Sequence, residues 1–170
     1  MKRGLLIVGA GAYGAVARDI AMEMGCFDRI AFADDYATVT AAGDAVLCRS
    51  DDAATMREYG SVVVAIGNPD VRLTLIERFS AMEGVGVVSL ISPRAFVSPS
   101  ASLGAGCIVE PMAVVSAGAR LGDGCLVCAG AVVNHFSVCE TCVQVDCNAT
   151  VAGNAHVPRG TKINSNTVYG

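Results

Sequence analysis

The chain has 170 residues, a formal net charge of −4 and only 5% aromatic residues. This length allows one large or two small domains, and an acidic chain without basic clusters argues against nucleic acid as a main partner. No apolar run reaches the roughly 18 residues of a transmembrane helix, so we expect no membrane span. Gly9 and Gly11 interrupt the apolar start, which therefore favours a strand and turn over a signal peptide and predicts a cytoplasmic protein.

The first part of the chain has the pattern of a nucleotide-binding βαβ unit. An apolar strand over residues 5–8 leads into G-x-G-x-x-G at 9–14, and a helix is predicted from about 13 to 24, where glycine ends it. A second strand over 30–33 ends in Asp34-Asp35, which lies 20 residues after the last glycine of the motif. This spacing is typical of the acid that binds a ribose in NAD sites.

The elements that follow complete only a small domain. The apolar pattern predicts a short strand over 46–48, a helix over 51–59, a strand over 62–66, a helix over 70–82 and a last strand over 87–91. This leaves room for about one mononucleotide-binding half of a Rossmann fold, without a second half for nicotinamide. We therefore expect an α/β Rossmann-like domain over 1–92 and a second domain over 93–170.

From Ala95 to its end, the chain repeats every six residues. The third place of each hexad is almost always aliphatic, the first is almost always small, and places four to six have turn residues, as in Gly122-Asp123-Gly124. Gly or Asn fills place six in eight of the twelve complete hexads, where a left-handed backbone costs these residues little. The period fits a parallel β-helix, whereas hairpins would need an alternation of period two.

Two C-x-x-C pairs, at 125–128 and 139–142, have the spacing of a zinc ribbon. In the repeat, however, their four cysteines occupy places one, four, three and six. These places point in different directions in a triangular coil, so the thiolates would not converge on one tetrahedral ion. We expect no metal, and cysteines that serve as small, reduced core residues.

The whole arrangement resembles the hexapeptide-repeat acyltransferases, whose left-handed β-helix places three hexads in each triangular coil. Among them the chain is similar to the sugar acetyltransferases of the sialic-acid O-acetylation and bacillosamine N-acetylation type, which join a small nucleotide-binding domain to the repeat. The resemblance covers residues 4 to about 166 and implies that residues 18 apart stack in columns. Its motifs are Gly9-Ala10-Gly11-Ala12-Tyr13-Gly14, Asp34-Asp35, Ala65-Ile66-Gly67-Asn68, Ser98-Pro99-Ser100-Ala101, Asn134-His135 and Ala152-Gly153-Asn154.

The resemblance implies that the first domain holds a uridine diphosphate sugar. Backbone amides of the first turn and of the helix N-terminus would face the diphosphate, and an acid at 34 or 35 would take sugar or ribose hydroxyls. The side chain at 72 would either meet a phosphate or be a solvated helix charge. The substrate-binding residues expected are Gly9, Gly11, Ala12, Tyr13, Gly14, Asp34, Asp35, Gly67, Asn68 and Arg72.

Asn134-His135-Phe136 breaks the repeat, because it puts two large rings at a corner where other hexads have small turn residues. From the pattern alone, a surface histidine packed against a neighbouring subunit is the simpler interpretation. The resemblance instead makes His135 the general base, with Asn134 beside it, and an imidazole titrates near neutrality. Gln144, Ala152 and Gly153 are then expected to contact acetyl-CoA in a groove between the β-helices of a homotrimer, with a backbone N–H near Gly153 holding the thioester oxygen.

The chain departs from these relatives in several places. Phe136 stands where related sequences commonly have an acid that orients the base, and Asp146 or Glu140 would have to replace it. Cys128 stands where some relatives have Asn, and the chain ends at Gly170 inside a hexad without the polar cap that solenoids normally need, which favours association.

The sequence thus predicts an acetyl-CoA-dependent acetyltransferase that modifies the oxygen or nitrogen of a nucleotide-activated sugar in surface-glycan biosynthesis. One alternative is a catalytically weak or inactive relative that keeps the sugar-nucleotide site, which the phenylalanine after the predicted base favours. Another is an NAD-binding protein with a structural β-helix, which the G-x-G-x-x-G motif and its acid favour.

Overall fold

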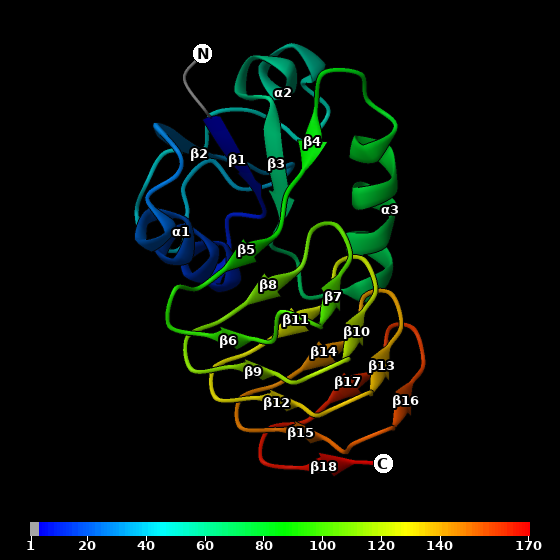
Figure 1. Cartoon of the computed structure of the whole chain (residues 1–170). Helices are drawn as coiled ribbons and strands as arrows, with labels where there is room; N and C mark the ends of the chain where they lie inside the picture. The colour runs from blue at the N-terminus through cyan, green and yellow to red at the C-terminus, as the bar shows by residue number, and fades with distance from the viewer. Residues whose placement is uncertain (1–3) are drawn as a thin grey trace. The chain divides into compact units, whose positions relative to one another are not determined.

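The computed structural model describes residues 4–170, and the chain separates into two compact units, Met1–Leu90 and Ile91–Gly170 (Figure 1). The division lies two residues before the expected boundary, because Ile91 already belongs to the first strand of the repeat, β5 (Leu90–Ile91). Within residues 4–170, no helix has the length and apolar character that crossing a membrane would require.

The first unit is built on a four-stranded parallel sheet in the order β2-β1-β3-β4. Every residue of β1 is buried, as expected for a central strand of a parallel sheet. The strands are β1 (Gly4–Val8), β2 (Arg29–Ala33), β3 (Ser61–Val64) and β4 (Gly86–Val87), and the helices are α1 (Ala12–Met24), α2 (Ala53–Tyr59) and α3 (Pro69–Ser80). Gly25 ends α1 in a left-handed conformation, with φ of 63°, which confirms the predicted stop.

Two predicted strands of this unit are wrong. The segment over 46–48 is no strand, because Cys48 forms only an isolated bridge with Ala33 and the preceding residues fold into turns, such as that closed by the Thr40 N–H on the Asp44 carbonyl. The single strand predicted over 87–91 is two strands. β4 ends the sheet of the first unit at Val87, whereas β5 belongs to a sheet of the repeat.

The second unit is a left-handed parallel β-helix; the hexads predict the parallel β-helix, and the resemblance implies its left hand. Its two-residue strands stack in three parallel sheets, ordered β16-β13-β10-β7, β17-β14-β11-β8-β5 and β18-β15-β12-β9-β6. The remaining strands are β6 (Phe96–Val97), β7 (Ser102–Leu103), β8 (Ile108–Val109), β9 (Val114–Val115), β10 (Arg120–Leu121), β11 (Leu126–Val127), β12 (Val132–Val133), β13 (Val138–Cys139), β14 (Gln144–Val145), β15 (Thr150–Val151), β16 (His156–Val157), β17 (Lys162–Ile163) and β18 (Val168–Tyr169). The register joins residues 18 apart, as Val114 pairs with Phe96 on one side and with Val132 on the other.

The interior of the β-helix is filled by residues from two places of each hexad, the first and the third. Small first-place residues such as Ala113 and Ala131 are fully buried, and so are third-place aliphatics such as Val115 and Val133. Ser137 also takes a first place, where its Oγ donates to the Asn134 carbonyl at 2.6 Å and so satisfies a buried hydroxyl. The corner that carries His135 is therefore held from within.

The sixth place of each hexad from 106 onward has a positive φ. These residues are Gly106, Met112, Gly118, Gly124, Gly130, Phe136, Cys142, Asn148, Asn154, Gly160 and Asn166. Only Met112, Phe136 and Cys142 among them are neither Gly nor Asn, with φ of 63°, 53° and 59°. A side chain with a Cβ costs roughly 1–2 kcal/mol in this conformation, so the backbone under Phe136 is a costly corner that the neighbouring coils impose.

Candidate functional site

The three glycines of the first turn have different surroundings. A Cβ at Gly9, whose φ is +117°, would lie 2.7 Å from the Ala65 carbonyl oxygen, and a Cβ at Gly14 would lie 2.1 Å from the Gly9 carbonyl oxygen. A Cβ at Gly11 would meet nothing within 4 Å. The outer two glycines are thus required by the close approach of the chain to itself, while the middle one faces open space.

That open space lies at the N-terminus of α1. Gly11 is the N-cap, and within the described turn at 11–14 the helix start has neither a side-chain cap nor an acidic residue. The amides and the positive end of the helix dipole therefore favour a bound anion. Ala12 and Tyr13 follow Gly11 as the first two residues of the helix. Four predicted substrate-binding residues, Gly11, Ala12, Tyr13 and Gly14, therefore form one turn.

A cleft of about 150 Å³ opens at the same end of the sheet, where β1, β2 and β3 end. Parallel α/β sheets bind their ligands at the carboxyl ends of their strands. The residues that line this cleft are Val8, Gly9, Asp34, Asp35, Tyr36, Ser50, Ile66, Val71 and Leu75.

Asp34 ties the glycine turn to the end of β2. Its carboxylate accepts hydrogen bonds from the backbone N–H groups of Ala10 at 2.8 Å, Tyr36 at 2.9 Å and Ala37 at 2.9 Å. Partial burial raises the pKa of Asp34, but these three N–H donors, Ala37 first, outweigh it and hold the pKa below the ordinary value. The carboxylate is therefore ionised and already shapes the turn before any ligand arrives.

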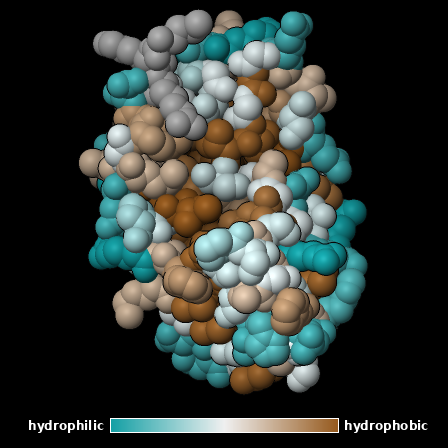
Figure 2. Space-filling view, in the orientation of Figure 1, coloured by the Kyte–Doolittle hydropathy of each residue, from teal (hydrophilic) through white to brown (hydrophobic). Residues whose placement is uncertain are grey.

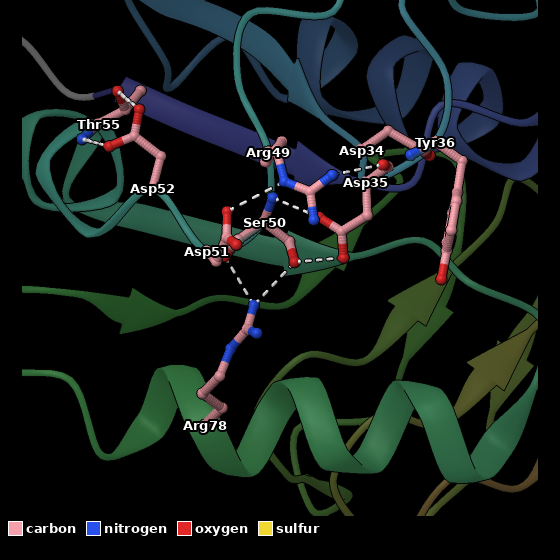
Figure 3. Close-up of polar contacts among 9 residues, drawn as sticks. All are labelled: Asp34, Asp35, Tyr36, Arg49, Ser50, Asp51, Asp52, Thr55 and Arg78. Atoms are coloured by element: carbon pink, nitrogen blue, oxygen red, sulfur yellow. Dashed lines mark hydrogen bonds and ion pairs between the residues drawn. The ribbon is translucent and has the colours of Figure 1, made fainter.

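Asp35 is engaged in a side-chain network of the loop after β2 (Figure 3). Ser50 donates to it through its backbone N–H at 2.8 Å and its Oγ at 2.9 Å, and Arg49 donates to the Asp35 carbonyl at 2.8 Å. Arg78 of α3 donates to the carbonyl and Oγ of the buried Ser50, at 2.6 and 2.9 Å. This network fixes Asp35 in the wall of the cleft. Of the two acids, Asp34 is the one that contacts the glycine turn, through the Ala10 N–H.

Asn68 and Arg72, two predicted substrate-binding residues that follow β3, stabilise the local structure. Asn68 caps α3, because its Oδ1 accepts from the N–H groups of Asp70 at 3.0 Å and Val71 at 3.1 Å. Arg72 is fully buried and donates through Nη1 to the carbonyls of Ile66 at 2.6 Å and Gly67 at 2.9 Å. The interpretation of Arg72 as a solvated helix charge is therefore wrong, and a phosphate contact would require its guanidinium to leave these carbonyls.

Six lining residues of this cleft were not among the predicted substrate-binding residues: Val8, Tyr36, Ser50, Ile66, Val71 and Leu75. Tyr36 directly follows the acidic pair at the end of a strand, and its side chain is 98% exposed. Val71 and Leu75 are four residues apart on α3, and so share one face of that helix. The position after the acids was the available signal for Tyr36, while Ser50 gave none.

His135 lies at the corner between β12 and β13, exposed to solvent. Its N–H donates to Asn134 Oδ1 at 2.8 Å, and its carbonyl accepts from the Asn154 N–H at 3.0 Å. The imidazole lies against Gly153 of the next coil, since a Cβ there would come within 2.5 Å of the ring carbon Cε1. The stacking of Gly153 on His135 that the 18-residue column predicts is thus confirmed.

The two carboxylates considered as replacements for the acid that orients the base, Glu140 and Asp146, are occupied elsewhere. Glu140 contacts Nε2 of His156 at 2.7 Å and accepts from the Arg159 N–H at 2.8 Å, and these two hydrogen bonds, that of His156 first, lower its pKa. Asp146 accepts from Gln144 Nε2 at 2.6 Å and lies 3.2 Å from Lys162 Nζ. Within residues 4–170, the neighbouring ring of His135 is that of Phe136, at 5.9 Å between centroids and 73° between planes.

The three residues predicted to bind acetyl-CoA do not come together within one chain. Ala152 and Gly153 follow β15 and lie at the corner of His135, but Gln144 opens β14, which belongs to a different sheet. The Ala152 and Asn154 N–H groups are committed to the carbonyls of Tyr169 and His135, at 2.8 and 3.0 Å. Among residues 152–154, the Gly153 N–H therefore remains as a hydrogen-bond donor beside the imidazole.

The cysteines remain separate thiols. Cys107 Sγ donates to the Gly122 carbonyl at 3.3 Å and Cys125 Sγ to the Glu140 carbonyl at 3.1 Å. Burial raises the pKa of the Cys139 thiol to about 12, with the nearby Cys107 adding to the shift. In the part of the chain that the structure describes, His, Cys, Asp and Glu side chains form no group of three or more suited to a metal ion.

Comparison with known proteins agrees with this architecture. The family model for the PglD N-terminal domain matches residues 4–79. The structure of the acetyltransferase domain of PglB from Neisseria gonorrhoeae FA1090, in complex with acetyl coenzyme A, superposes with a TM-score of 0.92 and 31% identity, over 99% of this chain and 82% of that chain. The chain belongs to the hexapeptide-repeat sugar acetyltransferases.

Two further structures share the fold of this acetyltransferase. A mutant of the perosamine N-acetyltransferase from Caulobacter crescentus, in complex with CoA and GDP-perosamine, has 23% identity and a TM-score of 0.68, over 97% of this chain and 90% of that chain. WeeI from Acinetobacter baumannii AYE has 18% identity and a TM-score of 0.70, over 99% and 95%. A search of curated proteins found no match. Membership of this enzyme family argues against the alternative of an NAD-binding protein whose β-helix is only structural.

Proposed function

We propose that this acetyltransferase transfers the acetyl group of acetyl-CoA to a nucleotide-activated amino sugar of surface-glycan biosynthesis, with His135 as the general base. The observation that carries the proposal is the corner at which His135, beside the Gly153 N–H, interrupts an otherwise inert wall of small turns. Its support is the chain-long likeness to an acetyltransferase domain that was crystallised with acetyl coenzyme A.

The chemistry that this corner supports is direct transfer. His135 takes the proton of the sugar amine or hydroxyl while that group attacks the thioester carbonyl carbon. The Gly153 N–H donates to the oxygen that becomes negative in the tetrahedral intermediate, since preorganised donors act where charge develops. The carbon–sulfur bond then breaks, the CoA sulfur leaves as thiolate, and the proton held by His135 returns to it. The protein contributes proton transfer through the His135 imidazole and electrostatic stabilisation through the Gly153 backbone N–H, and both groups already lie at this corner.

The cleft of the first unit supports binding of the sugar nucleotide. The N-terminus of α1 and the open space at Gly11 suit the diphosphate. Asp34 has an ionised carboxylate that suits ribose or sugar hydroxyls, and the exposed ring of Tyr36 offers an aromatic face for the base. We take the base to be uracil, as the resemblance to the sugar acetyltransferases implies.

We also propose a homotrimer with threefold symmetry. The outward residues of the sheet β18-β15-β12-β9-β6 are mostly apolar, with Phe96 and Val168 among the exposed large hydrophobics. Apolar side chains also reach the surface over the repeat in Figure 2. A contiguous apolar face suits a subunit contact. A neighbouring copy would then supply Gln144 to the groove at His135, where one chain alone does not bring the two together.

The test is acetylation of a uridine diphosphate amino sugar, followed by mass spectrometry so that the free cysteines do not interfere. His135→Ala should lose about 10²–10⁴ in turnover, while calorimetry shows acetyl-CoA affinity nearly unchanged. The matched control is His156→Ala, which removes the other histidine of the chain and leaves the corner at Gly153 intact. A His135→Ala protein that acetylates at the wild-type rate would make the histidine a packing residue.

The second candidate function is that of an inactive relative that still binds the sugar nucleotide. The observation that favours it is the absence, within residues 4–170, of a carboxylate on the His135 imidazole. Tight binding of the sugar nucleotide together with no product from the wild-type protein would select this candidate, whereas turnover that depends on His135 would reject it.

A further inference from the structure

Two glycines of adjacent coils make room for the two rings at the His135 corner. A Cβ at Gly153 would come within 2.5 Å of the His135 imidazole, and a Cβ at Gly118 would come within 2.4 Å of the Phe136 ring carbon Cδ1. Gly153 belongs to the coil after the corner and Gly118 to the coil before it, 18 residues away in each case. Each ring therefore packs against the backbone of a glycine, and the two rings contact each other in an edge-to-face arrangement.

The backbone under these rings is held from both sides. The Phe136 N–H donates to the Ala117 carbonyl at 3.0 Å, and the His135 carbonyl accepts from the Asn154 N–H. These bonds keep Phe136 at φ 53°, a conformation in which glycine would be the cheaper residue. Eight other hexads use Gly or Asn at this place and two use Met112 and Cys142, so among the residues with positive φ Phe136 is the aromatic one, and it stands beside the proposed base.

We propose that Phe136 is a positioning residue, which fixes the plane of the His135 imidazole by edge-to-face packing where no carboxylate reaches the ring. The inference rests on the proposed function of His135 as the base. Edge-to-face contact with centroids 4.5–7 Å apart is a favourable aromatic geometry, and the observed 5.9 Å and 73° fall within it. With Gly153 beneath it and Phe136 at its side, the imidazole is confined on two sides.

This arrangement has a chemical consequence that a carboxylate would not produce. The phenyl ring restrains the imidazole but offers it no carboxylate oxygen, so no charged acceptor among the described residues of this corner selects a tautomer of His135. The imidazolium that forms on proton transfer also gains no neighbouring negative charge. A carboxylate would both orient the imidazole and stabilise the imidazolium. At this corner Phe136 supplies only the orientation.

The test compares Phe136→Gly with Met112→Gly. Met112 is matched, because it also fills place six with positive φ and an exposed apolar side chain, but it is remote from His135 in the hexad pattern. Both variants should melt no lower than wild type, because the backbone strain that glycine relieves at this positive φ outweighs the entropy that glycine adds to the unfolded chain. Turnover should fall by about 10- to 10²-fold only for Phe136→Gly, with KM little changed, as expected for a misplaced base. Phe136→Tyr should keep the wild-type turnover.

A second readout reports the packing without catalysis. The chain has two histidines, so two sets of imidazole proton signals are expected by NMR, and His156→Ala assigns them. Phe136→Gly should shift the His135 signals and Met112→Gly should not. Phe136→Glu should move the acidic limb of the kcat/KM profile to higher pH, because a carboxylate favours the imidazolium. The limb shift shows that a side chain at position 136 reaches the imidazole, and the loss of kcat with little change in KM in Phe136→Gly is the response that a purely structural role would not produce.

The inference would be overturned if the His135 signals stayed in place in Phe136→Gly. It would also be overturned if the loss appeared only in KM, since Phe136 would then be a substrate contact. Failure of the proposed function is seen separately, as full activity of His135→Ala, because the imidazole signals report the ring contact whether or not His135 is the base.

Discussion

Gly11→Val should separate ligand binding from folding in the first unit. A Cβ at Gly11 meets nothing within 4 Å, and the φ of −75° and ψ of −171° suit any residue. Valine is a poorer N-cap than glycine, by up to about 1 kcal/mol, but it also lowers the entropy of the unfolded chain by roughly 0.4–1 kcal/mol. We therefore expect the free energy of unfolding to change by less than about 1 kcal/mol.

The same side chain would fill the space through which a diphosphate reaches the N-terminus of α1. Loss of even two amide contacts to a charged group, at about 1.5–3 kcal/mol each, corresponds to at least a hundredfold weaker binding at 1.4 kcal/mol per tenfold. Calorimetric titration with a uridine diphosphate sugar measures this loss, and urea unfolding measures stability. Acetyl-CoA affinity serves as the internal control, since the proposed groove lies in the repeat.

Gly14→Ala is the matched control, because it should reduce stability where Gly11→Val should not. Its Cβ would lie 2.1 Å from the Gly9 carbonyl oxygen, a backbone atom that cannot rotate away. We expect a destabilisation of about 1–3 kcal/mol or more, the range of overpacked sites. The reasoning would be refuted by a folded Gly11→Val protein that binds the sugar nucleotide as tightly as wild type, because the diphosphate would then lie elsewhere.

Three further predictions concern the acid, the ring and the assembly. Hydrogen bonds hold the pKa of Asp34 below its ordinary 3.8 despite partial burial, so its stabilisation is fully present at neutral pH and declines once the pH falls below 3.8 towards the lowered folded-state pKa. Asp34→Asn should therefore lower the urea midpoint more at pH 7 than at pH 3, and an equal loss at both would contradict the shift. Tyr36→Ala should weaken sugar-nucleotide binding by about tenfold, near the lower end of base-stacking energies, while Tyr36→Phe should not; equal affinities for both variants would exclude stacking. Light scattering at micromolar concentration should give three times the 17.3 kDa chain mass, and Phe96→Glu should lower it; a wild-type monomer would exclude the proposed trimer.

The repeat was predictable because its signal is local and recurs. The residue types in each hexad predict the positions of an inward aliphatic residue, a small residue and a left-handed corner. The corners at Gly124 and Asn148 have the positive φ that this pattern requires. The glycine turn was predictable from its motif, although only part of its cause is local. Gly14 is required by the Gly9 carbonyl of the same turn, whereas Gly9 is required by the Ala65 carbonyl after β3.

The errors arise where tertiary contacts decide. Residues 46–48 have the composition of a strand but form only an isolated bridge, and no local pattern distinguishes the two. Arg72 has the spacing of a surface helix charge, yet its guanidinium is buried on two strand-end carbonyls. The partners of the corner acids were equally hidden, because Glu140 meets His156 only through the stacking of adjacent coils.

The stacking of Gly153 on His135 also determines which insertions and deletions this chain can tolerate. Between residues 135 and 153, a deletion of one hexad would bring Arg159 into the column of His135, and an insertion of one hexad would bring Cys147 there. Both side chains would occupy the space that the imidazole now uses. A whole coil of 18 residues inserted after the corner at 153 would instead preserve every column before it. Changes in the length of this wall should therefore be compatible with the site in steps of 18 residues, even though the sequence repeats every six.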